Sequence, residues 1–261
     1  MSSQEQPPNL NPREIQKKFI KKIFNIELYD YQIDFICDCM NLERIIGVFC
    51  RQSGKSMCIA IVAILEALRN SNENILLIAP TDLQAGTLFD KVSMYLRNSL
   101  LIGEIDTITK RQVILKNGAK ILAHTTGEKG DTIRGLTGKV IIMEESAYIK
   151  DSIVYEVVTP MGAAKNAKFI KISTPFGMNH FYDSAFKNNW KLHQIPYSIP
   201  VKEGLIKQSY IEEQKETTTD IQFRTEYNAE FIADEDAYFK TELIQNCIFD
   251  YPLIEVNYAI A

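Results

Sequence analysis

The sequence contains few of the residues that build metal clusters and disulfide frameworks. Its 261 residues include three widely separated histidines and five cysteines, an odd number with no CxxC spacing. These residues form no zinc-binding pattern, and they do not suggest the paired cysteines of a small secreted protein. We therefore expect a reduced, intracellular protein.

Long apolar runs are also missing. No stretch approaches 18 apolar residues, so we expect no transmembrane helix and no membrane partner. Residues 1–12 are polar and rich in proline and asparagine, and they lack the apolar segment of a secretory signal. We interpret them as a loose arm.

Neither sign of charge is in large excess. The chain has 29 Lys+Arg and 33 Asp+Glu, a net charge of −4, which excludes a uniformly basic nucleic-acid coat protein. The distribution is uneven, because residues 1–200 hold 24 basic and 20 acidic side chains, whereas residues 201–261 hold 5 and 13. A local basic site in the body of the chain therefore agrees with the composition.

What the chain does contain is an alternation of short apolar runs with helical patterns. We expect strands at residues 44–50, 74–79, 140–143 and 168–173, and helices at residues 55–69 and 83–97. An amphipathic pattern over residues 13–26 predicts a surface helix before the first strand. Strands that alternate with helices predict an α/β fold, with a mostly parallel sheet covered by helices on both faces.

Two segments depart from this alternation. Apolar residues at 111–115 and 120–124 flank an Asn-Gly pair, which predicts a β-hairpin inserted into the sheet or added at its edge. From about residue 198 the pattern changes to charged helical stretches, including residues 207–216 and 221–227, which we interpret as a small separate subdomain. We therefore divide the chain into an N-terminal arm and helix (1–26), a core (27–198), and a subdomain with a C-terminal linker (199–261).

A Gly-Lys-Ser sequence lies between the first expected strand and the helix after it. Gly54 would let the backbone pass close to phosphate oxygens, and the helix N-terminus would offer N–H groups to an anion. Lys55 would neutralise the β- and γ-phosphates of a nucleotide, and the Ser56 hydroxyl would hold Mg²⁺. The alternative is an ordinary helix N-terminus with a surface lysine, but the strand before and the helix after favour a phosphate-binding loop.

This loop departs from the common GxxxxGK[ST] pattern in two ways. The first glycine of the pattern is replaced by Phe49, and an arginine, Arg51, stands inside the loop. A guanidinium group at this position can reach either the γ-phosphate or a neighbouring acidic side chain.

Two adjacent carboxylates, Glu144 and Glu145, end the apolar run at 140–143. In a P-loop fold such a strand lies beside the phosphate loop, where its first acid supports Mg²⁺ and its second orients or deprotonates the attacking water. Glutamate replaces the more usual aspartate at position 144, which favours an outer-sphere contact with the metal. The alternative is a solvated strand end.

Three further polar residues are candidates for a role in hydrolysis. Arg134 lies in a polar loop next to a glycine, and it is either an arginine finger that stabilises the transferring phosphoryl group or a surface arginine. Ser173 and Thr174 end the run at 168–173, where their hydroxyls either sense the γ-phosphate or cap the following turn.

Taken together, these residues resemble the ATPase domain of the large terminase subunit, the motor that packages viral DNA into preformed capsids. The resemblance spans roughly residues 27–233 and rests on the joint order and spacing of several motifs. These are Tyr31-Gln32, the loop at 51–56, Ile78-Ala79-Pro80-Thr81 with Gln84-Ala85, the strand end at 142–147, the segments at 173–177 and 179–182, and those at 222–227 and 229–231.

The resemblance implies a RecA-like (ASCE) P-loop NTPase with ATP and Mg²⁺ as cofactors, and a small C-terminal lid subdomain. It implies that Gln32 reads adenine, that Arg134 completes a neighbour's site in trans, and that Ser173 and Thr174 couple hydrolysis to movement. The remaining residues that it places at the nucleotide are Arg51, Gln52, Ser53, Gly54, Lys55 and Ser56.

The resemblance also implies partners. These are double-stranded DNA, further copies of the chain in a ring (a pentamer, by the resemblance), the capsid portal and the small terminase subunit, all in the host cytoplasm. Relatives place basic residues near the inserted hairpin, which indicates Lys110, Arg111 and Lys129 as DNA contacts through phosphates. The alternative is a solvated hairpin edge.

We expect, on this basis, an ATP-hydrolysing motor domain that translocates double-stranded DNA into a capsid. The nuclease domain that usually follows in large terminases is absent from the sequence, so we expect either an excised motor domain or a nuclease on a separate chain. Two alternatives stay open: a helicase-like nucleic-acid translocase, and a nucleotide-dependent assembly switch with negligible hydrolysis.

Overall fold

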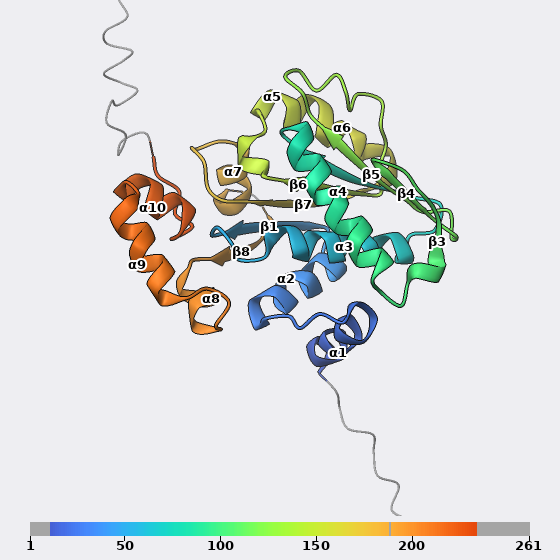
Figure 1. Cartoon of the computed structure of the whole chain (residues 1–261). Coiled ribbons are helices and arrows are strands. Elements are labelled where there is room, and N and C mark those ends of the chain that lie inside the picture. Colours follow the sequence, from blue (N-terminus) through green and yellow to red (C-terminus); the bar gives the residue numbers. More distant parts are fainter. Residues whose placement is uncertain (1–10, 188, 234–261) are drawn as a thin grey trace, which may run out of the picture.

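The computed structural model describes residues 11–187 and 189–233 of the chain. Most of the expected N-terminal arm and all of the C-terminal linker after residue 233 lie outside the described residues. The described part forms a sheet with helices on both faces and a group of three helices, α8–α10, at one side (Figure 1).

The sheet has eight strands in the order β3-β4-β5-β2-β6-β7-β1-β8. The six strands from β5 to β8 in this order pair in parallel, and β3 and β4 add to β5 in antiparallel fashion. The strand bounds are β1 Arg44–Phe49, β2 Asn74–Ala79, β3 Ile105–Ile108, β4 Gln112–Leu115, β5 Lys120–Thr125, β6 Val140–Glu144, β7 Lys168–Ser173 and β8 Lys191–Ile195.

This arrangement confirms the predicted fold class and the predicted hairpin. The hairpin consists of β4 and β5, and it lies at the edge of the sheet, where β5 also pairs with β2 in parallel. β3 extends it to a third antiparallel strand that the sequence did not predict.

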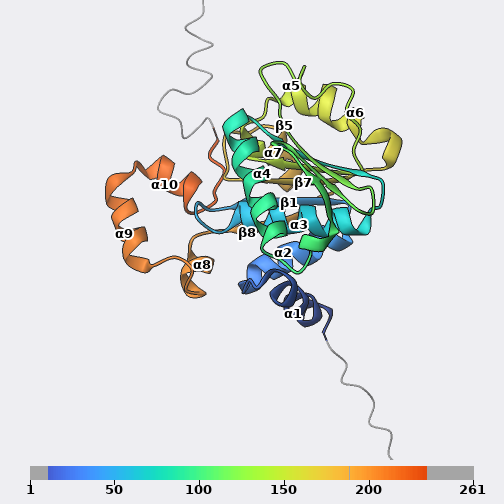
Figure 2. The same cartoon turned by 45° about the vertical axis from the view of Figure 1, so that its right-hand side comes forward.

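The helices flank the sheet and follow its strands along the chain (Figure 2). Their bounds are α1 Pro12–Phe24, α2 Asp30–Asn41, α3 Lys55–Arg69, α4 Asp82–Arg97, α5 Asp151–Ile153, α6 Thr159–Met161, α7 His180–Phe186, α8 Ser198–Lys202, α9 Gln208–Thr217 and α10 Asp220–Glu226. A short π-helix, Val154–Val158, joins α5 to α6.

The strands are apolar on both faces because both faces are covered. On β2, Ile75 and Leu77 belong to the core formed with α1–α4, whereas Leu76 and Ile78 belong to the core formed with residues 149–161. Strands buried in this way appear in the sequence as continuous apolar runs rather than as alternating ones.

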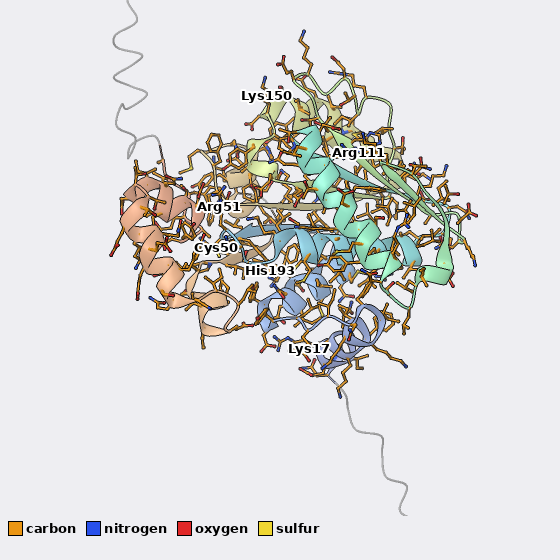
Figure 3. All side chains as sticks on the ribbon, in the orientation of Figure 1. Lys17, Cys50, Arg51, Arg111, Lys150 and His193 are labelled. Carbon is orange, nitrogen blue, oxygen red and sulfur yellow. The ribbon has the colours of Figure 1, made fainter. Side chains whose placement is uncertain are left out.

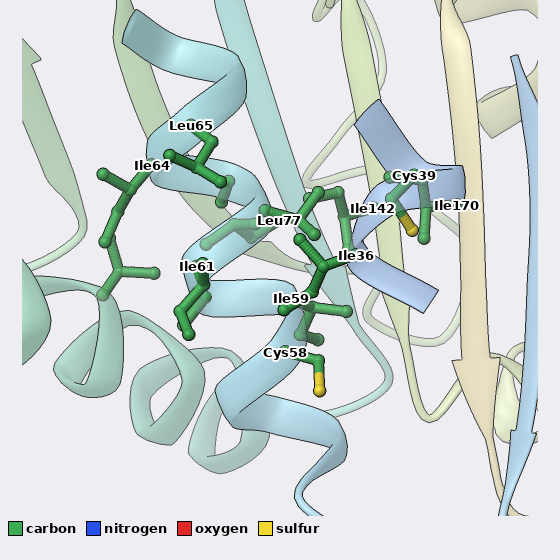
Figure 4. Close-up of a cluster of buried hydrophobic side chains, with 14 of the residues drawn as sticks. Ile36, Cys39, Cys58, Ile59, Ile61, Ile64, Leu65, Leu77, Ile142 and Ile170 are labelled. Carbon is green, nitrogen blue, oxygen red and sulfur yellow. The ribbon is translucent and has the colours of Figure 1, made fainter. Parts of the chain in front are cut away.

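Helix α3 lies at the centre of the larger core. Its buried residues face α2 and the sheet, where Ile36 and Cys39 of α2 and Ile142 and Ile170 of the sheet lie around it (Figure 4). Each fully buried aliphatic side chain of this kind contributes roughly 1.5–3 kcal/mol to folding. The helix begins at Lys55, directly after Gly54, so its N-terminus is held in a fixed position relative to the strands.

The helices α8–α10 stand beside the end of β1 (Figure 1). They enclose a small apolar cluster of Ile206, Ile211, Phe223 and Tyr227, which also contains Cys50 at the start of the phosphate loop. A backbone bond from Tyr197 N–H to the Tyr227 carbonyl, 2.8 Å, closes the group. Its status as a separate lid subdomain stays a prediction.

Candidate functional site

The loop between β1 and α3 folds back over itself. Gln52 and Gly54 adopt positive φ angles of 59° and 86°, and the Ser53 hydroxyl donates to the Cys50 carbonyl at 2.6 Å. Glycine accepts such an angle at position 54 without strain, and a Cβ there would lie 2.5 Å from Gln32 Nε2. The loop is thus a tight turn that presents its backbone at the N-terminus of α3.

Gln32 and Tyr31 lie under this turn and hold it. The Gln32 amide and the Tyr31 hydroxyl both donate to the Ser53 carbonyl, at 3.1 Å and 2.8 Å, and Gln32 Oε1 accepts from Tyr29 N–H at 3.1 Å. Gln32 is 1% exposed and does not line the cavity described below. The structure therefore gives Gln32 a supporting position under the loop, and its direct contact with adenine stays a prediction.

Glu145 follows the last residue of β6 and faces the loop. One oxygen of its carboxylate, Oε1, lies 4.0 Å from Lys55 Nζ, and the other, Oε2, accepts a 3.0 Å hydrogen bond from Ser173 Oγ. Glu145 has φ 47° and ψ 44°, a left-handed conformation that is uncommon for a residue other than glycine and that concentrates at functional sites.

The sequence predicted that the strand before Glu145 lies beside the phosphate loop, and the structure brings Glu145 to within 4.0 Å of Lys55 in that loop. β7 lies between β1 and β6, so the two strands are not direct neighbours. Lys55 and Glu145 still meet, because the carboxyl ends of parallel strands share one edge of the sheet.

Lys55 and Glu144 are both buried, and each is close enough to influence the pKa of the other. Burial lowers the pKa of the Lys55 ammonium, and the carboxylate of Glu145 opposes this effect. Burial raises the pKa of Glu144, whereas a hydrogen bond with Ser56 and the charges of Lys91 and Lys55 act in the opposite direction. Charged groups buried in this way gain most from a ligand of complementary charge.

Ser56 and Glu144 are the predicted metal pair, and the structure brings them into hydrogen-bond contact. A hydroxyl and a carboxylate are oxygen ligands of the kind that Mg²⁺ accepts. Residues 11–187 and 189–233 contain no cluster of three or more His, Cys, Asp or Glu that would hold a metal by itself. The donor set therefore fits a cation that takes its remaining ligands from phosphate and water.

These residues border a cavity of about 780 Å³. Seven of its lining residues were predicted from the sequence, namely Arg51, Gln52, Gly54, Lys55, Ser56, Glu145 and Thr174. Ser173 and Glu144 do not line the cavity but contact Glu145 and Ser56, which do. Ser53 is buried within the loop. The other lining residues are Met57, Gln84, Lys91, Tyr95, Tyr148, Tyr210 and Glu226.

No role was predicted from the sequence for these other lining residues. Gln84 and Glu226 fall inside segments that carry the family resemblance, which is the signal that could have found them. Tyr95, Tyr148 and Tyr210 come from three separate elements, and nothing in their local sequence indicates that they meet.

Arg51 connects the loop to α10. Its Nη1 lies 3.2 Å from Glu226 Oε2, and its backbone N–H donates to the Glu226 carbonyl at 2.8 Å. Of the two targets predicted for this guanidinium, the neighbouring acidic residue is the one that it contacts here. Figure 3 shows Arg51 between the sheet and α10.

Arg134 does not line the cavity of its own chain. It lies in the loop between β5 and β6, its side chain is 56% exposed, and its Nε lies 3.6 Å from Asp131 Oδ1. An exposed arginine outside its own site is available to a neighbouring molecule, and the role in trans stays a prediction.

The three predicted DNA contacts differ in their environment. Lys110 and Lys129 are exposed, whereas Arg111 packs against α4, where its Nη2 lies 2.7 Å from Asp82 Oδ2 and donates to the Asp82 carbonyl (Figure 3). Arg111 is thus partly occupied by a bond within the chain. DNA contact stays a prediction for all three.

No helix within the described ranges is long and apolar enough to cross a membrane.

Comparison with known proteins identifies similar chains. A family model described as "Terminase large subunit, T4likevirus-type, N-terminal" matches residues 46–246. The terminase large subunit of Thermus phage G20c is 26% identical over 234 residues, which cover 76% of this chain and 47% of that protein. The chain thus spans about half the length of the curated relatives that it matches.

Two solved structures share the fold. The large terminase ATPase domain of Thermus phage P74-26 has a TM-score of 0.68 and 21% identity, covering 82% of this chain and 98% of that one. The large terminase of a thermophilic bacteriophage in complex with ADP has a TM-score of 0.60 and 14% identity, covering 77% of this chain and 52% of that one.

Proposed function

This chain belongs to the T4likevirus-type terminase large subunit family, whose N-terminal domain it matches, and on this premise we propose that it is the ATP-hydrolysing motor domain that drives double-stranded DNA into a capsid. The ADP bound to the structurally similar large terminase of a thermophilic bacteriophage supports a nucleotide in the equivalent fold.

The observation that carries the proposal is the placement of Glu145. Its carboxylate lies 4.0 Å from Lys55 Nζ and is bonded to Ser173, at the wall of a cavity formed by the phosphate loop. A carboxylate next to the phosphate-binding lysine can accept a proton from water that attacks the γ-phosphate. An assembly switch without hydrolysis has no need of this second acid.

Different residues of the chain bind the phosphates, activate the water and connect the site to the C-terminal helices. The N–H groups of the loop and Lys55 bind the phosphates, Glu145 orients and deprotonates the water, and Ser173 fixes the direction of the Glu145 carboxylate. Arg51 and Glu226 join the loop to α10, so that changes at the nucleotide reach the C-terminal helices. Thr174, which lines the cavity, carries the signal toward the segment that follows β7.

Mg²⁺ would be held by Ser56, with Glu144 behind it, and when bound it would neutralise charge on the phosphate oxygens. The hydrogen bond between Ser56 and Glu144 orients the hydroxyl oxygen, and Glu144 itself is buried.

The assembly is the finer part of the proposal. The chain acts as one subunit of a ring, by family resemblance a pentamer, in which the exposed Arg134 reaches a neighbour's γ-phosphate. Its partners are double-stranded DNA, the capsid portal and the small terminase subunit, and it acts in the cytoplasm of the infected host. Lys110, Lys129 and, more weakly, Arg111 contact DNA phosphates.

The test of the function is Glu145→Gln. This variant removes the base but keeps the size of the side chain and its hydrogen bond with Ser173, so ATP binding is retained while phosphate release falls by about 100-fold or more. The exposed Glu156→Gln is a matched control that keeps full turnover. Unchanged hydrolysis in folded Glu145→Gln would remove Glu145 from the mechanism.

The two alternatives have distinct signatures. Strand separation of a DNA duplex by the wild-type chain would favour a helicase-like translocase. ATP-dependent association without measurable phosphate release would favour an assembly switch.

A further inference from the structure

The short turn that carries Glu145 is held at several points by the end of β7 and by the segment after it. Ser173 bonds to the Glu145 carboxylate, Asn179 Nδ2 donates to the Ala147 carbonyl at 2.6 Å, and the backbone N–H of His180 donates to Asp151 Oδ1 at 3.1 Å. The turn itself closes with a bond from Tyr148 N–H to the Glu145 carbonyl, 3.0 Å.

His180 makes a further bond at the end of this turn. Its ring is fully buried, and Nε2 lies 3.1 Å from the Ile149 carbonyl oxygen, which can accept but not donate. Nε2 must therefore carry the proton. The other ring nitrogen, Nδ1, then accepts from Lys171 Nζ at 2.9 Å, so the two partners of His180 define its tautomer.

Lys171 reaches His180 from the same strand that supplies Ser173. Positions 171 and 173 lie on one face of β7, because side chains alternate along a strand. Lys171 is 3% exposed, also bonds to Ser184 Oγ at 2.8 Å, and lies over the Trp190 ring, 4.9 Å from its centre. The C-terminal part of β7 therefore contacts both ends of the turn at residues 145–149. Ser173 bonds directly to Glu145, and Lys171 acts on Ile149 through His180.

The charge state of His180 supports a fixed role. Burial and the neighbouring Lys171 lower the pKa of His180 to about 4, while Asp151 opposes them. The ring is thus neutral at the pH of hydrolysis and keeps the same tautomer throughout. A donor that neither titrates nor rotates is suited to hold a backbone carbonyl in place.

We propose that His180 is a positioning residue for Glu145. His180 holds the turn at residues 145–149 through the Ile149 carbonyl, so that the Glu145 carboxylate faces the attacking water. The idea rests on the proposed ATP hydrolysis. In this proposal Lys171 acts through His180, because its bond to Nδ1 fixes the His180 tautomer.

The test compares two amide side chains at position 180. In His180→Asn the side-chain oxygen can still accept from Lys171, but the amide is too short to reach the Ile149 carbonyl. In His180→Gln the longer amide can reach it. We expect His180→Asn to lower kcat on the order of tenfold with little change in KM for ATP, and His180→Gln to retain most of the wild-type kcat.

A second measurement reports on the turn without hydrolysis. The N–H groups of Tyr148 and Ile149 donate to Glu145 and Ser146 carbonyls, and their hydrogen exchange should be faster in His180→Asn than in His180→Gln. If His180→Asn fails to fold, the double variant Lys171→Met/His180→Phe removes the donor to the Ile149 carbonyl without leaving a buried charge unpaired. The same fall in kcat and the same faster exchange are then expected of it.

The outcomes separate this inference from the function on which it rests. A wild-type chain that does not hydrolyse ATP overturns the proposed function and the positioning role together. A wild-type chain that hydrolyses ATP, beside a folded His180→Asn variant with unchanged kcat and unchanged exchange at residues 148–149, overturns only the positioning role.

Discussion

Ser173 on β7 donates a hydrogen bond to Glu145 at the end of β6, with 3.0 Å between Oγ and Oε2. Because β7 lies between β6 and the strand of the phosphate loop, Ser173 stands between the candidate base and the candidate phosphate site. The other Glu145 oxygen is the one that faces Lys55. The contact thus divides the carboxylate into an anchored oxygen and an oxygen that faces the cavity.

Ser173→Ala should lower kcat while leaving ATP affinity nearly unchanged. A hydrogen bond to a charged group contributes about 1.5–3 kcal/mol, so we expect a loss on the order of tenfold in single-turnover hydrolysis. The exposed Ser152→Ala is the control for loss of a hydroxyl. A rise in KM without a fall in kcat would show that Ser173 acts on nucleotide binding instead.

Gln32→Met should weaken the binding of ATP and GTP by a similar factor. The substitution removes the bonds to the Ser53 carbonyl and Tyr29 N–H, which support the phosphate loop whatever base the nucleotide carries. Tyr31→Phe, which removes the other donor to Ser53, should give a smaller loss in the same direction. Affinities can be compared by calorimetry, and a loss confined to ATP would instead show that Gln32 reads adenine.

Much of the fold could be predicted because its central strands are continuous apolar runs. The bounds of β2, β7 and α3 agree with the sequence expectation, and those of β1 and β6 differ by one residue. The expected helices at 13–26, 83–97, 207–216 and 221–227 are α1, α4, α9 and α10, shifted by one or two residues at their ends.

The strands that the sequence did not predict are short or lie at an edge of the sheet. β3 has only four residues, of which Asp106 and Thr107 are exposed, and β8 pairs only with β1. Such strands lack a run long enough to show a period. Helix α2 was missed because its Tyr, Ile, Phe and Cys residues favour strands when considered locally, and packing against α3 decides the outcome.

The site divides in the same way. Lys55, Ser56 and Glu145 belong to local motifs, so the sequence alone indicated them. The contact of Arg51 with Glu226, and that of Lys171 with His180, depend on how α10 and α7 pack against the sheet. No local pattern encodes either pair, since each joins elements that are brought together by the tertiary fold.

Gly54→Ala should destabilise the protein and abolish nucleotide binding. Alanine at φ 86° is strained, at a cost of about 1–3 kcal/mol, and its Cβ would meet Gln32 Nε2 at 2.5 Å. Gly204 has a similar φ of 84° with no heavy atom within 4 Å, so Gly204→Ala measures the backbone strain alone. Urea unfolding should show a larger loss for Gly54→Ala than for Gly204→Ala, and equal losses would contradict the proposed close contact.

Lys171→Met should remove a pH dependence of stability. Burial lowers the pKa of Lys171 from 10.5 to about 7, with Asp151 opposing and Arg44 adding to the effect. Between these two values the unfolded chain holds a proton that the folded chain has released, so unfolding takes up a proton and a rise in pH disfavours it.

The free energy of unfolding of the wild type should therefore increase relative to Lys171→Met as the pH rises from 7 to about 10, by on the order of a few kcal/mol. The contribution of Lys171 itself should level off below pH 7, because both states of the wild type then hold the Lys171 proton. The exposed Lys18→Met is the control and should follow the wild type. Parallel curves for wild type and Lys171→Met would show that the amine is not perturbed.

Arg134→Ala should reduce hydrolysis in assemblies while ATP affinity is retained. The guanidinium is exposed and lies outside its own chain's cavity, so its effect on the reaction requires a neighbouring molecule. Arginine fingers contribute about 10³–10⁵ to kcat, and we expect a loss near the lower end of that range.

Mixing Arg134→Ala with Glu145→Gln should restore part of the activity, because a site with an intact Glu145 then meets a neighbour with an intact Arg134. The exposed Lys150→Ala is the control for loss of a surface cation. Turnover should be measured on mixtures that sedimentation shows to be assembled, and assembled mixtures without restored turnover would place the arginine finger elsewhere in the chain.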